Sequence, residues 1–120
     1  MAKVLCGYYG SEPMEITEFA SVGRGWYSLI EELTEKLVKM AEEAGIEDFR
    51  VVDVKEKFGG LRYYVTEATE EMWQLIHEAE EKSFEICEEC GAKGELMIRG
   101  HWYGTRCPRC AEKGGWKRID

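Results

Sequence analysis

The chain has 120 residues, enough for one ordinary domain or for a small domain with an appended module. Hydrophobic residues make up 44% of it and charged residues 33%, as in soluble globular proteins, and no apolar run approaches the roughly 18 residues of a membrane-spanning helix. The apolar stretch at the start is too short for a secretory signal, so we expect a protein of the cytoplasm with no membrane partner.

The charge is unevenly distributed along the chain. The net charge is −8, yet residues 97–120 hold six basic and two acidic side chains, which gives +4 there and leaves −12 for the first 96 residues. Such asymmetry indicates an interaction surface without naming its partner. The acidic part opposes wrapping of nucleic acid around the whole protein, whereas the basic segment allows local contact.

The first part of the chain predicts a short strand within residues 1–9 and then a long helix. Gly-Arg-Gly at residues 23–25 predicts a loop, and apolar residues at helical spacing from Trp26 to Ala44 predict an amphipathic helix. Gly45 is well placed to end this helix in a left-handed conformation.

From Phe49 to Thr66 the apolar period becomes that of a strand, and a reversal at Gly59-Gly60 predicts a tight hairpin. One face then holds Val52, Val54, Phe58, Leu61, Tyr63 and Val65. The other face holds Val51, Asp53, Lys55, Lys57, Arg62, Tyr64 and Thr66. Lys55, Lys57 and Arg62 form a basic stripe there, which we interpret either as a binding surface or as an ordinary solvated sheet face.

A second amphipathic helix follows, with Thr69 as its N-cap and an inner stripe that runs from Met72 to Ile86. Residues 1–86 therefore predict an α+β body in which two amphipathic helices surround a β-hairpin.

Two cysteine pairs carry the clearest chemical signal. Cys87-Glu-Glu-Cys90 and Cys107-Pro-Arg-Cys110 are separated by 16 residues, the spacing of a four-thiolate zinc site. Between them, residues 95–99 and 102–106 predict a short hairpin around Gly100-His101. Residues 87–120 thus predict a zinc ribbon with a basic tail and one structural zinc ion.

Iron is the main competitor for these ligands, because thiolates accept both metals. A catalytic metal is disfavoured, since four protein thiolates leave no open position for water. The fifth cysteine, Cys6, is expected to be a buried apolar residue.

Basic and aromatic residues alternate in the ribbon and tail, a pattern that suits either unpaired nucleic acid or a protein partner. The candidates are Arg99, Trp102, Tyr103, Arg106, Arg109, Lys117 and Arg118. The alternative is that the rings pack the ribbon against the body while the cations are simply solvated.

Three segments carry a resemblance: Gly25-Trp-Tyr27, the stretch Val54-Lys-Glu-Lys-Phe-Gly-Gly-Leu-Arg-Tyr-Tyr-Val65, and Ala79-Glu-Glu-Lys-Ser83 before the cysteine pairs. Together they resemble a group of small proteins from phage genomes and bacterial prophages, over roughly residues 22–112. No activity is established for that group, so the resemblance implies a phage-related origin and transfers no functional residue.

We therefore expect a non-enzymatic, zinc-binding, phage-type accessory protein that binds a host or phage protein, with inhibition of a host defence or transcription component as one form of action. The first alternative is a nucleic-acid-binding zinc ribbon. The second is a nuclease or other enzyme, for which spacing alone assembles no active constellation.

Overall fold

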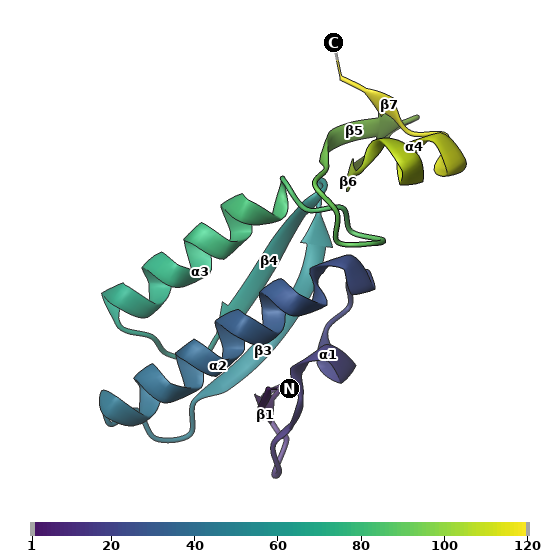
Figure 1. Ribbon diagram of the computed structural model, residues 1–120. Coiled ribbons are helices and arrows are strands. Elements are labelled where there is room, and N and C mark those ends of the chain that lie inside the picture. Colours follow the sequence, from purple (N-terminus) through teal and green to yellow (C-terminus); the bar gives the residue numbers. More distant parts are fainter. Residues whose placement is uncertain (1, 120) are drawn as a thin grey trace.

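The computed structural model describes residues 2–119 and shows a mixed α+β protein with two sheets and four α-helices in that range (Figure 1). The elements are β1 (Lys3–Cys6), β2 (Met14–Glu15), α1 (Ile16–Phe19), the 3₁₀ turn η1 (Arg24–Trp26), α2 (Tyr27–Glu43), β3 (Arg50–Lys57), β4 (Gly60–Val65), α3 (Glu70–Ser83), β5 (Glu95–Arg99), β6 (Trp102–Arg106), α4 (Pro108–Gly114) and β7 (Lys117–Arg118). Over these residues, every helix is too short or too polar to cross a bilayer.

The larger sheet has the strand order β2-β1-β3-β4, in which β1 and β3 are parallel and the other pairs are antiparallel. Helices α2 and α3 lie side by side across one face of it (Figure 1). Ile30 of α2 and Ile76 of α3 pack in one core with Trp26 of η1 and Tyr63 of β4. The Tyr63 hydroxyl lies 2.7 Å from Thr34 Oγ1, so its polar atom keeps a partner inside this core.

The predicted ends of both helices are confirmed. Thr69 Oγ1 accepts a hydrogen bond from the Met72 amide at the start of α3. Gly45 follows α2 with a φ of 72°, and the amide of Ile46 donates to the Ala41 carbonyl. The N-terminal strand is also present, as β1.

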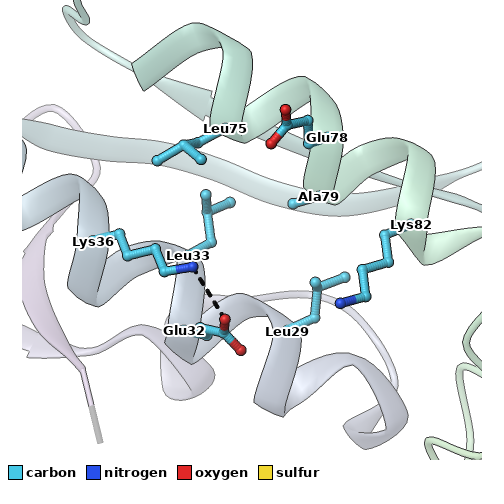
Figure 2. A pocket seen from close by; sticks show the side chains of 8 residues that line it. All are labelled: Leu29, Glu32, Leu33, Lys36, Leu75, Glu78, Ala79 and Lys82. Atoms are coloured by element: carbon cyan, nitrogen blue, oxygen red, sulfur yellow. Dashed lines mark hydrogen bonds and ion pairs between the residues drawn. The ribbon is translucent and has the colours of Figure 1, made fainter. Parts of the chain in front are cut away.

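The seam between α2 and α3 is apolar at its floor and charged at its rim (Figure 2). Leu33 and Leu75 face each other across it, and Lys36 pairs with Glu32 at 3.1 Å on its edge. The groove measures about 140 Å³, well below the roughly 300–1,000 Å³ of small-molecule sites. It is a packing seam between two helices.

The reversal between β3 and β4 lies one residue earlier than predicted. Lys57 pairs with Gly60, so the turn consists of Phe58 and Gly59, with φ angles of 53° and 86°. Two consecutive positive φ angles match the tight turn that suits the twist of an antiparallel pair. Gly60 is the first residue of β4, where the Phe84 ring occupies the space of a side chain. Phe58, predicted on the core face, is 65% exposed.

The predicted faces of β3 are wrong at its start because the strand contains a β-bulge. Val51 pairs with Val65 and Asp53 with Tyr64, so one extra residue lies on β3. The extra residue reverses the alternation of side chains. Val51 consequently joins Val54 in the core, and Val52 is only partly buried.

The outer edge of β4 is protected by side chains of α3. Ser83 Oγ accepts a hydrogen bond from the Leu61 amide at 2.9 Å, and the Glu80 carboxylate accepts one from the Tyr63 amide at 3.1 Å. Ser83 is buried and its hydroxyl donates to the Glu80 carbonyl. These contacts satisfy edge-strand amides that would otherwise be open to another strand.

Replacing Ser83 by Ala should lower the free energy of unfolding by about 1–3 kcal/mol, because the buried Leu61 amide loses its acceptor. Denaturant unfolding followed by circular dichroism measures this change. Ser28→Ala on the exposed side of α2 is the matched control and should leave stability nearly unchanged. Equal stabilities of the two variants would contradict this account of the edge.

Candidate metal centre

The four predicted cysteines meet at one point. The sulfur atoms of Cys87, Cys90, Cys107 and Cys110 all lie within 4.8 Å of one another, and those of Cys90 and Cys107 are 3.6 Å apart. Sulfurs bound to zinc at about 2.3 Å in a tetrahedron are about 3.8 Å apart, whereas a disulfide needs about 2.05 Å. All four are free thiols. The cluster fits a metal ion and does not fit two disulfides.

Local structure explains why each pair converges. Cys107 is the N-cap of α4, Pro108 occupies the first turn, and the Cys110 amide points at the Cys107 sulfur at 3.4 Å. In the first pair, the Gly91 amide donates to the Cys87 carbonyl at 3.0 Å. Gly91 has a φ of 86°, as expected for the sharp turn after Cys90.

The thiols of the second pair differ in acidity. The hydrogen bond from the Cys110 amide lowers the pKa of Cys107 to about 7. The interaction with the Cys107 sulfur, together with burial, raises the pKa of Cys110 to about 12. Metal binding at these four cysteines would be coupled to release of the thiol protons, because only thiolates are ligands.

The first cysteine pair is held from the body by the loop that precedes α2. The Gly25 amide donates to the Glu88 carbonyl at 2.8 Å, and the Trp26 indole Nε1 donates to the Ile86 carbonyl at 2.8 Å. Trp26 is fully buried. A methyl group on Gly25 would overlap the Cys87 carbonyl oxygen, so only glycine allows this approach.

Glu88, inside the first cysteine pair, binds strand β6, and Thr105 of β6 contacts the turn of the larger sheet. Its carboxylate accepts a hydrogen bond from the Thr105 amide at 2.7 Å and pairs with Arg106 at 2.9 Å. The Thr105 hydroxyl in turn donates to the carbonyl of Gly59 at 2.7 Å. Burial raises the pKa of Glu88, while the Thr105 amide and Arg106 act in the opposite direction.

Glu88 was not among the predicted site residues. The sequence offered only weak evidence for its role: an acidic residue inside the first cysteine pair and an arginine directly before Cys107. Nothing in the spacing told which of Glu88 and Glu89 turns inward, and the structure shows that Glu88 is buried while Glu89 is exposed.

Two of the predicted binding residues lie on a ring. The guanidinium carbons of Arg99 and Arg106 lie 4.5 and 4.4 Å from the centroid of Trp116. Trp116 is buried with Met97 and Ala111 in a small second core. With 13% side-chain exposure and a paired charge, Arg106 supports this unit and is not available on the accessible basic surface.

The other candidates are distributed over separate surfaces. Arg118 pairs with Glu95 at 2.7 Å, and Lys117 is exposed beside it. Arg109 lines a pocket next to Cys90 together with Arg24 and Lys113. Trp102 is 72% exposed.

Tyr103 lies where the two sheets meet. It is 44% exposed, and its ring contacts Phe58 edge-on with centroids 6.3 Å apart. On β3 and β4, Lys55 and Lys57 are exposed and Arg62 is half-buried.

No known protein family, curated protein or solved structure matches the chain. The chemistry of the site is carried by its donor set: four soft thiolate ligands, enough to complete a tetrahedral centre without water. Cys6, the fifth thiol, is buried as expected, and burial raises its pKa.

Gly25→Ala should weaken metal binding, because the added methyl pushes the Cys87 backbone out of place. Titration with cobalt(II), followed through its thiolate absorption, measures the affinity, which we expect to fall at least tenfold. Gly45→Ala is the control: nothing lies near the added methyl there. Its left-handed φ should cost about 1–2 kcal/mol of stability without changing the cobalt titration. Equal cobalt affinities for the two variants would contradict the role of Gly25 in positioning the Cys87 backbone.

Glu88→Ala should destabilise the metal-loaded protein by about 1–3 kcal/mol, because the buried Thr105 amide loses its acceptor and Arg106 keeps only the exposed Glu89, 3.4 Å away, as its carboxylate partner. Glu88→Gln keeps an acceptor for the Thr105 amide, so its loss should be smaller. Thermal unfolding of the metal-loaded proteins measures the stabilities of the parent, Glu88→Gln and Glu88→Ala, which we expect to decrease in that order. A Glu88→Ala variant as stable as the parent would show that the contacts of Glu88 with Thr105 and Arg106 do not stabilise the protein.

Proposed function

We propose that this chain is a non-enzymatic, zinc-binding accessory protein that acts by binding a macromolecular partner. In this proposal Cys87, Cys90, Cys107 and Cys110 hold one structural Zn²⁺, and residues 87–120 form a zinc ribbon with a basic tail. The observation that carries the proposal is the convergence of the four sulfurs within 4.8 Å. When bound, zinc supplies a closed cross-link and no reactive water.

The ribbon has little else to keep it folded. Its separate hydrophobic core consists of Met97, Ala111 and Trp116. Structural zinc in comparable peptides contributes roughly 10–16 kcal/mol at neutral pH, far more than three side chains supply. Metal binding and folding of the ribbon are therefore coupled.

Exposed aromatic rings support a binding role. Phe58 and Trp102 are 65% and 72% exposed, and Tyr103 lies against Phe58 at the junction of body and ribbon. Rings of this size are enriched where proteins meet their partners. A phage origin, which the resemblance implies, points to a host or phage machine as the partner. We propose inhibition of a host defence or transcription component as the form of action.

Nucleic acid is the second candidate partner. It is favoured by the exposed Lys55 and Lys57 on the sheet face opposite the helices. An enzymatic role is not proposed, because the four-thiolate centre leaves no coordination position for a substrate or water.

Purified protein should contain one zinc ion per chain by elemental analysis; iron in its place would correct the identity of the metal. Removal of zinc by a chelator should increase amide hydrogen exchange across residues 87–118, while amides of α2 and α3 remain protected. The reason is that the body has its own core of buried residues. Protein without bound metal, or loss of protection over the whole chain, would contradict the proposal.

The binding role is tested with the same material. Immobilised zinc-loaded protein should retain a defined macromolecule from bacterial lysate, and the chelator-treated protein should retain less of it. Repeated recovery of nothing would argue against a binding function and would leave the metal centre intact.

A further inference from the structure

We propose that the outer face of β3 and β4 is a binding site for single-stranded nucleic acid. The residues of this outer face are Lys55, Lys57, Phe58, Arg62 and Tyr64. The inference rests on the proposed binding function and selects nucleic acid, the second candidate partner named there, as the ligand of this face.

The outer face is the side of the sheet opposite the helices. Helices α2 and α3 cover one side of the sheet (Figure 1). Tyr63 lies on that side, because its hydroxyl contacts Thr34 of α2. The strand register sets Lys55 beside Arg62 and Asp53 beside Tyr64 on the other side. Lys55 is exposed and Tyr64 is 41% exposed, so this side is accessible to a ligand.

Cations and rings are paired along the outer face. Lys55 Nζ lies 5.7 Å from the centroid of the Tyr64 ring, and Lys57 Nζ lies 5.8 Å from that of Phe58. Each pair presents one positive charge and one aromatic surface. That is the combination a nucleotide requires, because its phosphate is anionic and its base stacks on rings.

Phe58 has a backbone conformation that is unfavourable for a residue with a side chain. Its φ of 53° lies in the left-handed region, which costs a residue with a side chain about 1–2 kcal/mol relative to glycine. The ring is 65% exposed, so burial does not offset this strain. Strained residues that persist on a surface cluster at ligand sites. The edge contact with Tyr103 adds a third accessible ring from the ribbon.

The charges favour nucleic acid over a protein partner. Lys57 and Arg62 make no ion pair within residues 2–119, and the pair between Lys55 and Asp53 is exposed at 3.5 Å. Lysine is depleted at protein interfaces but serves well as a point charge for phosphate. The first 96 residues carry −12 in total, so within them a polyanion is attracted only to local groups of cations such as this face. Stacking on the rings requires unpaired bases, hence a single strand.

The decisive variant is Phe58→Gly. Glycine relieves the left-handed strain and removes the ring, so the protein should be at least as stable as the parent. Binding of a fluorescein-labelled oligothymidylate to the zinc-loaded full chain, measured by anisotropy at low salt, should weaken about tenfold or more. Tyr9→Ala is the matched control: Tyr9 is 97% exposed in the connection between β1 and β2, and binding should be unchanged.

The cations are tested through salt dependence. The double variant Lys55→Gln/Lys57→Gln should reduce the slope of log affinity against log salt by about 1.4, the loss of two contacts with single-strand phosphates. Lys36→Gln/Lys82→Gln makes the same charge change on the helix side and should leave the slope as it is.

The metal content of every variant is measured beside its affinity, which separates this inference from the proposed function. The inference is overturned if a loaded parent protein forms no complex at low salt, if Phe58→Gly binds like the parent, or if duplex DNA binds as tightly as the single strand. A captured protein whose retention depends on Phe58 would also overturn it, since the outer face would then be a protein interface.

Discussion

The first cysteine turn packs directly against the backbone of another segment, and there is no room for a side chain between the two. Gly25 supplies that segment, with its amide on the Glu88 carbonyl and no atom where a methyl would meet Cys87. Trp26 fills the space below and binds the Ile86 carbonyl. The first cysteine turn is thus anchored by η1, directly before α2 and about 60 residues earlier in the chain. This contact attaches the sulfur cluster to the helix core.

Residues far apart in the sequence build the junction between the cysteine turn and the larger sheet. Gly25 and Trp26 hold the cysteine turn, and Gly59 accepts the Thr105 hydroxyl. Ser83 closes the edge of β4 one residue before Phe84, whose ring lies against Gly60. These contacts pack the two sheets against each other at the cysteine turn.

Much of the local structure was predictable because it depends on short-range patterns. Thr69, Gly45 and the strands around Gly100 follow from capping rules and apolar periodicity, and the cysteine spacing predicts the cluster. The turn at Phe58 was not predictable, because glycine adopts positive φ angles more readily and Gly59-Gly60 was therefore the expected loop. Gly60 lies in the strand instead, where the Phe84 ring occupies the space of a side chain. The bulge at Val52 adds one residue that no alternating pattern reveals. The role of Glu88 depends on Thr105 and Arg106, which approach it only in three dimensions.

The hydrogen bond from Thr105 to Gly59 joins the turn that displays Phe58 to the strand that leads into Cys107. In the proposed function, the metal ion and a ligand of the turn therefore act on the two ends of one hydrogen bond, which couples their binding. By thermodynamic reciprocity, whatever ligand prefers the turn in its present shape tightens the hold on the ion by the same factor as the ion tightens the hold on that ligand. A cell poor in the metal would then hold this protein in a form with a weaker grip on its target.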